Sequence, residues 1–329
     1  MGMAWGLRIY LLKKDQRIVF SKYLLAGTIP VLLSCVLQLW FGFDRGPYTT
    51  LNNLIIWFQY PIKEVGGLTG LFNNQNVLGM WLSVSLALSL GLIKEEKNAI
   101  SKLSLLSFVI LIIYFIFLTN SRNAFLALLI TIFISRGIKK GFYILISSIS
   151  FLFVTNILYP FENNNNLVYI PIKLLEKLQL SYSFFEDRIY IWNEALKLIL
   201  QRPFLGWGGS TFPYLVQKEG IGFVANHTHN LQLELAFSFG IPASLIFTFF
   251  IIKLARKSFN NIFIDKKDGA SNMINKSWFL CFVLILVSHI TDMTFFDGRI
   301  SIILAIIISG LINIVNEPNQ LIAKKNKAI

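Results

Sequence analysis

Residues 103–119 read LSLLSFVILIIYFIFLT, a run that contains no charged residue. An α-helix of roughly 17 to 25 apolar residues is long enough to cross the hydrocarbon core of a bilayer. The Ile, Leu and Phe side chains of this run would be costly to expose to water. The run therefore predicts a transmembrane helix, and similar runs recur through most of the chain.

The composition of the whole chain also indicates a membrane protein. Of its 329 residues, 55% are hydrophobic and 14% are charged, against roughly 25% charged in soluble domains. A soluble fold of this size could not bury so much apolar surface in one core, so lipid must act as the solvent. Cys35 and Cys281 both lie in apolar runs, which indicates buried thiols rather than a disulfide framework. We expect an all-α polytopic membrane protein.

Six further runs have the length of a span: 23–41, 77–93, 142–159, 231–252, 276–294 and 300–315. Gly240 and Pro242 are expected to kink the helix over 231–252. The run 123–135 is short, but a basic cluster and a new apolar run follow it, so the chain must turn there. Counting it as a span gives about eight transmembrane helices.

An even number of spans places both termini on one side of the membrane, and the basic residues identify that side as the cytoplasm. Twenty of the 30 Lys and Arg residues fall on the side of the termini, against only six of the 17 acidic residues. This excess of basic residues is spread over several short segments, which lack the aromatic side chains on which nucleic-acid bases stack. Topology therefore explains the net charge of +13, and we exclude a nucleic-acid partner.

The spans divide the chain into five parts. A cytoplasmic or interfacial N-terminus (1–22) precedes spans one to five (23–159), an outer loop (160–230) follows, and spans six to eight (231–315) lead to a basic cytoplasmic tail (316–329). Residues 1–12 lack the features of a cleavable signal peptide, so the first span is expected to be its own anchor. The long outer loop is the natural place for function, because loops on a rigid scaffold carry many binding and catalytic residues.

Arg122 lies in a short outer turn, 119–123, between two apolar runs. A charge at a membrane boundary needs water or a partner, and the Thr, Ser and Asn residues of this turn supply further donors for an anion. The alternative is an arginine that reaches out to the lipid headgroups.

An amphipathic helix is predicted from Arg188 onwards, with Asp187 as its N-cap, because apolar residues recur at helical spacing: Ile189, Trp192, Leu196 and Ile199. An arginine in a first turn opposes the helix dipole, so Arg188 at this helix start suits a bound phosphate. A local ion pair with Glu186 or Asp187 is the alternative.

Two of the three histidines, His227 and His229, directly precede the apolar run 231–252. Neutral imidazole accepts a proton readily near neutral pH, and a helix N-terminus helps to keep it neutral, so the pair predicts a general base. The same pair could begin a metal site with ligands recruited from the last outer turn: His289, Asp292 and Asp297. We favour the base over the metal.

Taken in order, these features resemble the O-antigen ligase and polymerase family over roughly residues 72–245. The resemblance rests on Phe72-Asn73-Asn74-Gln75-Asn76-Val77-Leu78-Gly79, Thr119-Asn120-Ser121-Arg122, the helix 188–195 followed by Pro203 and Gly206-Trp207-Gly208, and His229-Asn230-Leu231 leading to Gly240-Ile241-Pro242. The sequence departs from the family's pattern at Gln75, Ser238 and Ala243, and it has fewer spans at its N-terminus.

The resemblance implies an inverting glycosyltransferase of the bacterial inner membrane that needs no metal or other cofactor. It would move a glycan from a polyprenyl (undecaprenyl) diphosphate carrier to a hydroxyl of a glycan, lipid A-core or protein acceptor on the periplasmic face, where the loop 160–230 lies. Arg122 and Arg188 are the implied ligands of the diphosphate, and His229 is the implied base. The expected substrate-binding residues are Ser121, Asn230, Trp207 and Asn76.

Two other functions stay open from the sequence. Some relatives are described as inorganic carbon transporters, and charged or broken helices at mid-membrane would favour that function, but the spans here are nearly free of charge. A non-catalytic partner in an envelope complex is the third interpretation, favoured only by the short N-terminus.

Overall fold

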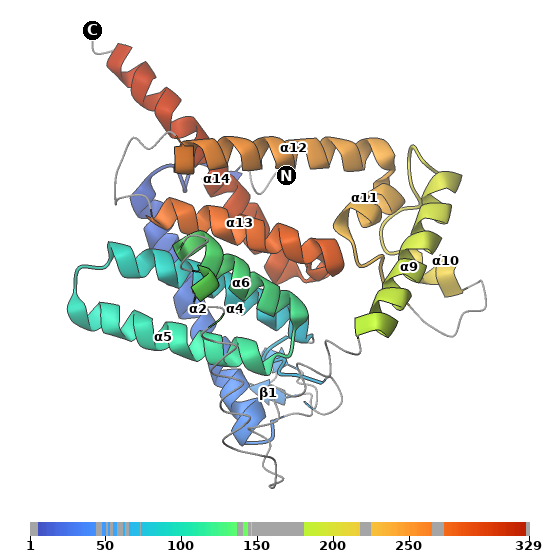
Figure 1. The fold of residues 1–329 in the computed structure, drawn as a ribbon, viewed down its shortest axis with the longest axis horizontal. Helices are drawn as coiled ribbons and strands as arrows, with labels where there is room; N and C mark the ends of the chain where they lie inside the picture. Colours follow the sequence, from blue (N-terminus) through green and yellow to red (C-terminus); the bar gives the residue numbers. More distant parts are fainter. Residues whose placement is uncertain are drawn as a thin grey trace. The chain divides into compact units, whose positions relative to one another are not determined.

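The computed structural model describes residues 6–43, 48–50, 52, 55–57, 62, 66–72, 74–136, 141–143, 146, 181–217, 225–264 and 273–326 (Figure 1). Most of these residues are helical, which confirms the predicted class. The helices are α2 (Lys14–Trp40), α4 (Gln75–Glu95), α5 (Ala99–Leu118), α6 (Arg122–Arg136), α9 (Ser181–Gln201), α10 (Phe212–Gln217), α11 (Leu231–Phe239), α12 (Ile241–Phe259), α13 (Met273–Thr291) and α14 (Gly298–Asn326), with a π-helical turn, η1 (Asn260–Ile264), and a 3₁₀ turn, η3 (Thr294–Phe296). The described residues also include one short antiparallel pair, β1 (Tyr48–Thr50) and β2 (Ile55–Trp57), which we did not expect.

Among the described helices, five are long and apolar enough to cross a membrane: Lys14–Trp40, Gln75–Glu95, Ala99–Leu118, Met273–Ile290 and Gly298–Asn316. The short run 123–135 lies in the apolar helix α6, which is shorter than these five, so its crossing stays a prediction. Most of the predicted span 142–159 lies outside the described residues. Eight spans and cytoplasmic termini therefore stay predictions.

The run 231–252 is two helices rather than one kinked helix. Gly240 has φ +87°, outside the helical region, so α11 ends before it and α12 begins after it. The amide of Ile241 donates to the carbonyl oxygen of Pro203 at 2.7 Å, which replaces a bond within the helix. We predicted a kink, and the chain makes a complete break because the next turn finds a partner outside the helix.

The chain forms two compact units. One unit consists of residues 9–178 and 268–285, and α4 is its most buried span. Small side chains let neighbouring helices approach α4: a Cβ on Gly79 would collide with Ala124 of α6. The hydroxyls of Thr28 and Ser85 join α2 to α4 at 2.9 Å. Small residues and interhelical hydrogen bonds are the usual means of helix association in lipid.

The other unit consists of residues 1–8, 179–267 and 286–329. Helices α9, α10 and α11 enclose its apolar core, in which the rings of Phe212 and Phe237 meet edge to face with centroids 5.1 Å apart. The buried members of this core are Ile191, Ala195, Ile199, Phe212, Val216, Ala225, Ala236 and Phe237. This core fixes α9 against α11, and the loop that precedes α11 carries two histidines.

Candidate active site

The loop before α11 is held by hydrogen bonds to the helix that follows it. Asn230 caps α11, and its Oδ1 accepts from the amide of Leu233 at 3.1 Å. The amide of Thr228 donates to Oε2 of the buried Glu234 at 3.1 Å. Between these two anchored positions His229 adopts a left-handed backbone, φ +53°, which is uncommon for a residue other than glycine. The loop therefore holds His229 in a defined position.

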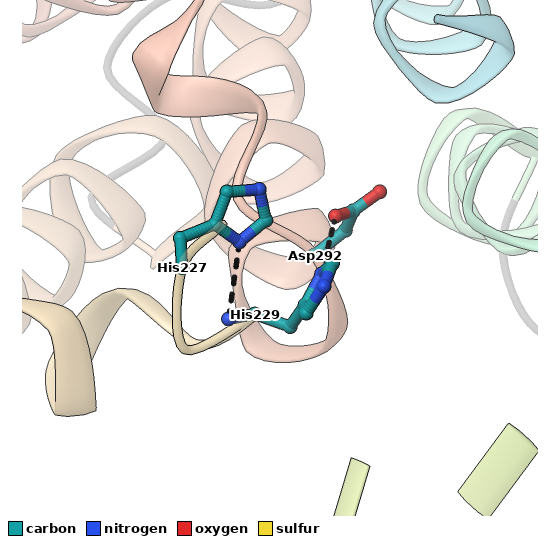
Figure 2. Close-up of side chains that lie close together, drawn as sticks. All are labelled: His227, His229 and Asp292. Atoms are coloured by element: carbon teal, nitrogen blue, oxygen red, sulfur yellow. Dashed lines mark hydrogen bonds and ion pairs between the residues drawn. The ribbon is translucent and has the colours of Figure 1, made fainter. Parts of the chain in front are cut away.

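His229 pairs with Asp292, which follows the C-terminal end of α13 (Figure 2). Nδ1 of His229 lies 3.1 Å from Oδ1 of Asp292, whose Oδ1 also accepts from the amide of Met293 at 2.8 Å. An ionised carboxylate only accepts hydrogen bonds, so Nδ1 is the donor and the lone pair of the neutral ring lies on Nε2. The His229 side chain is 24% exposed and the Asp292 side chain 8%, so the imidazole is accessible and the carboxylate is buried.

His227 supports the same loop from the other side of His229. Its Nδ1 accepts from the backbone amide of His229 at 3.3 Å, and the two ring centroids are 4.2 Å apart (Figure 2). Burial and the charge of His229 lower the pKa of His227 to about 4, with a smaller opposing effect of Asp292. His227 is therefore neutral near pH 7, with its proton on Nε2.

Asp292 remains ionised because its neighbours outweigh the effect of burial. Burial alone would raise the pKa of its carboxyl group, but the hydrogen bond from His229, the charge of Arg188 and the amide of Met293 lower it to about 2. A carboxylate that orients the imidazole and stabilises its protonated form is the arrangement that makes a histidine an effective base. The pairing with Asp292 is the geometry that such a base would need, and the role of His229 stays a prediction.

Arg188 is buried, but it is not in the first turn of its helix. α9 begins at Ser181, so Arg188 lies about two turns inside it and Asp187 is a helical residue rather than the N-cap. Both predictions were wrong because the helix extends upstream of the charged residues. The dipole of α9 therefore gives no reason to expect phosphate binding at Arg188. The buried guanidinium still acts through its charge on His227 and Asp292.

The buried face of α9 also differs from the prediction. Ile191, Ala195 and Ile199 are buried, whereas Ile189 and Leu196 are 52% and 47% exposed. The small side chain of Ala195 is fully buried in the core shared with α11, a contact that hydrophobic spacing alone does not identify.

Trp207 is held within the fold by its own hydrogen bonds. Its indole Nε1 donates to the carbonyl oxygen of Leu198 at 2.7 Å, and its amide donates to that of Phe237 at 2.8 Å. The guanidinium of Arg202 lies 4.1 Å from the ring centroid. The indole N–H is thus used inside the protein, and a role in substrate binding would have to use the ring surface.

The glycine turn that contains Trp207 interlocks with the break between α11 and α12. A Cβ on Gly206 would collide with the carbonyl oxygen of Phe237, and a Cβ on Gly240 would collide with that of Phe204. Both glycines have positive φ, +69° and +87°. Two motifs that are separated in the sequence therefore form one structural joint.

Three predicted site residues lie together in the unit formed by residues 9–178 and 268–285. Ser121 precedes α6, and its hydroxyl donates to Oδ1 of Asn76 at 2.7 Å. The same hydroxyl accepts from the amide of Ala124 at 3.3 Å, and Arg122 is the partly buried first residue of α6. The Thr and Ser side chains of the turn at 119–123 thus hydrogen-bond to backbone amides of the turn and of α6. The sequence had suggested them as donors to an anion.

The pairing of Asp292 with His229 was the main structural feature that sequence analysis missed. Asp292 was considered only as a recruited metal ligand, not as the partner of His229. The available signal was an acidic residue at the end of an apolar span, where an unpaired charge is costly. His227, His229 and Asp292 each offer one donor atom, and these three atoms lie within 4.8 Å of one another. Imidazole and carboxylate donors of this kind suit zinc, so the cluster can in principle serve either as a base or as a metal site.

Comparison with known families supports the assignment from the motifs. A family model described as O-antigen ligase matches residues 107–248, a range that includes Arg122, Arg188 and His229. No curated protein matches the chain. The predicted resemblance is thereby confirmed over residues 107–248, which match the O-antigen ligase family, in a chain whose described helices include five long and apolar enough to cross a membrane.

Proposed function

We propose that this protein is a glycosyltransferase that moves a glycan from a polyprenyl diphosphate carrier to an acceptor hydroxyl. The observation that carries the proposal is the pairing of His229 with Asp292 at 3.1 Å beside the buried Arg188. A general base with an orienting carboxylate and a nearby cation is what glycosyl transfer from a diphosphate requires.

The reaction begins with proton transfer from the acceptor hydroxyl to Nε2 of His229. The acceptor oxygen attacks the anomeric carbon as the bond from that carbon to the diphosphate oxygen breaks, and the bonding electrons leave with the diphosphate. A single displacement inverts the anomeric centre. The imidazolium that forms on His229 is stabilised by Asp292, which the structure places on the opposite ring nitrogen.

The arginines stabilise the negative charge that grows on the leaving diphosphate. Arg188 is the better supported of the two, because its charge already acts on the histidine and aspartate cluster. Arg122 enters through the family resemblance, with Ser121 and Asn76 ordering its turn. Asn230 supports catalysis by holding the loop, and Trp207 would offer its ring to a sugar.

The donor that fits this proposal is an undecaprenyl diphosphate oligosaccharide, with its prenyl tail in the bilayer. The acceptor is a growing glycan in a polymerase, or a lipid A-core or protein in a ligase. The site would face the periplasm from the bacterial inner membrane, with both termini in the cytoplasm. No metal cofactor has a part in this reaction.

The test is glycan transfer by the purified protein in lipid nanodiscs with a defined undecaprenyl diphosphate oligosaccharide. Each acceptor class is supplied separately, and a chelator is present throughout. We expect His229→Ala to lower turnover by about 10²- to 10⁴-fold, the usual contribution of a general base. Arg188→Ala should weaken use of the donor through the loss of transition-state charge stabilisation.

Asn226→Ala is the matched control, because Asn226 is exposed in the same loop. Transfer that survives His229→Ala would refute the general-base assignment. Absence of transfer by the wild-type protein with every acceptor would count against the enzyme itself and favour a transporter or a non-catalytic partner.

A further inference from the structure

His227, His229 and Asp292 lie close together (Figure 2), and each offers one possible ligand atom within 4.8 Å of the other two. The shortest separation, between Nδ1 of His229 and Oδ1 of Asp292, is 3.1 Å. In a tetrahedral zinc site with bonds of about 2.0 Å, neighbouring donor atoms lie about 3.3 Å apart. Two of the three donors therefore already have nearly the spacing of zinc ligands, and the third lies within 4.8 Å.

We infer that this cluster is an inhibitory zinc site, in which Zn²⁺ bound to His227, His229 and Asp292 stops glycan transfer. The inhibition rests on the proposed function of His229, whereas the binding of the metal does not. The donor set of two imidazoles and one carboxylate selects Zn²⁺ over Mg²⁺ and Ca²⁺, which prefer oxygen ligands.

Inhibition follows from the single proton of a neutral imidazole. Without metal, the proton of His229 lies on Nδ1 and points at Asp292, so Nε2 has the lone pair that accepts the acceptor's proton. A zinc ion on Nδ1 needs the lone pair of that nitrogen, so the single ring proton moves from Nδ1 to Nε2. The ring then has no site for a second proton, and Asp292 is occupied by the metal.

The residues around the cluster favour reversible rather than permanent binding of zinc. Binding through either nitrogen of His227 gives up the hydrogen bond from the amide of His229, because Nδ1 then either binds the metal or carries the single proton of the ring. That bond is long, at 3.3 Å. The charge of Arg188 reaches both Asp292 and His227 and so opposes a cation in the cluster. Removal of the Arg188 charge should therefore tighten zinc binding.

Metal binding is measured directly on the full chain in nanodiscs, purified with a tag that contains no histidine. Co²⁺ is the spectroscopic probe, because a tetrahedral site with nitrogen and oxygen donors gives visible absorption bands that Zn²⁺ removes by competition. We expect one bound equivalent. We expect Asp292→Asn and His227→Asn each to weaken binding by at least about tenfold, because the loss of a residue that only supports a metal ligand already costs about 10- to 100-fold. Arg188→Ala should strengthen it.

The controls separate this site from adventitious binding. Asp297→Asn is the matched carboxylate change, since Asp297 lies nearby in sequence but pairs with Arg299. Mg²⁺ is the matched cation. In the transfer assay, Zn²⁺ should abolish wild-type turnover and a chelator should restore it, while His227→Asn should need at least about tenfold more Zn²⁺ for the same inhibition.

The two proposals fail in different ways. Absence of a Co²⁺ spectrum, or a spectrum unchanged in both Asp292→Asn and His227→Asn, would overturn the zinc site whatever the activity. An active enzyme that binds Co²⁺ in the cluster but is unaffected by Zn²⁺ would overturn the inhibition. A protein that binds the metal but transfers no glycan would leave the zinc site standing and count against the proposed function.

Discussion

Asn230 donates from its side-chain amide to the carbonyl oxygen of Ile290 at 3.0 Å. This bond joins the residue after His229 to the residue two positions before Asp292. The same side chain accepts the amide of Leu233 through its Oδ1. One asparagine thus caps α11 and joins the loop of His229 to the end of α13 that carries Asp292.

The two functions of Asn230 can be separated by substitution. Asn230→Asp keeps the cap of α11, because Asp caps helices as well as Asn does, but it loses the N–H donor to Ile290. Asn230→Ala loses both the cap and the donor. We expect both variants to lose transfer activity, and Asn230→Ala alone to lose about 1 kcal/mol of stability. Turnover and thermal denaturation of the two proteins, measured side by side, would decide this. Normal turnover in Asn230→Asp would show that the bond to Ile290 has no catalytic importance.

Asp292→Asn should impair chemistry more than donor binding. The amide can donate to Nδ1 of His229 and so favour the wrong tautomer, and it no longer stabilises an imidazolium. We expect kcat to fall about 10²- to 10⁴-fold, comparable to the loss of a general base, with KM for the lipid donor little changed. Steady-state kinetics with Asp297→Asn as control provide the measurement. A rise in KM at constant kcat would instead assign Asp292 to substrate binding.

His227 should make the folded protein sensitive to mild acid. Its pKa is about 4 in the folded protein against an ordinary value of 6.5, so the unfolded chain binds a proton first as pH falls. This contribution to stability is complete above pH 6.5 and is lost progressively towards pH 4. The carboxyl of Asp292 shifts from 3.8 to about 2 and acts only below this window.

The apparent melting temperature should therefore fall between pH 6.5 and pH 4. His227→Asn keeps a hydrogen-bond acceptor but does not titrate there, so its melting temperature should depend less on pH in this range. Equal pH dependence in the two proteins would contradict the assignment of acid sensitivity to His227.

The glycine joint should tolerate no side chain. Gly240→Ala places a Cβ against the carbonyl oxygen of Phe204 at a backbone with φ +87°, and Gly206→Ala meets that of Phe237 at φ +69°. Each change should destabilise the protein by about 1 to 3 kcal/mol, the usual range for strain at a special φ. Gly209→Ala is the control, because nothing lies within 4 Å of its added Cβ. Melting temperatures equal to that of Gly209→Ala would contradict the steric argument.

Sequence analysis predicted the helical class because apolar runs of span length have few other stable forms in lipid. It failed at helix starts and breaks. Nothing in the charged stretch around Asp187 shows that α9 begins at Ser181, and the separation of α11 from α12 depends on a hydrogen bond from Ile241 to Pro203. The contact that accompanies the break at Gly240 joins distant segments, and local patterns do not contain it.

The site was partly predictable for a related reason. Chemistry pointed to the pair His227 and His229, because neutral imidazole accepts a proton readily near neutral pH, and the family resemblance chose His229. Its partner could not be chosen among the acids of the last outer turn, since Asp292 and Asp297 are equally near in sequence. Only the fold shows that Asp297 binds Arg299 and Asp292 binds His229.

The interlocked glycines have a consequence for chimaeras and for divergence within the family. Because the turn at Gly206 and the break at Gly240 fill each other's missing side chains, neither is an independent module. A recombinant that takes α9, α10 and the turn at Gly206 from one homologue and its α11–α12 corner from another would inherit two halves of different joints. A transplanted segment therefore has to include both the turn at Gly206 and the break at Gly240.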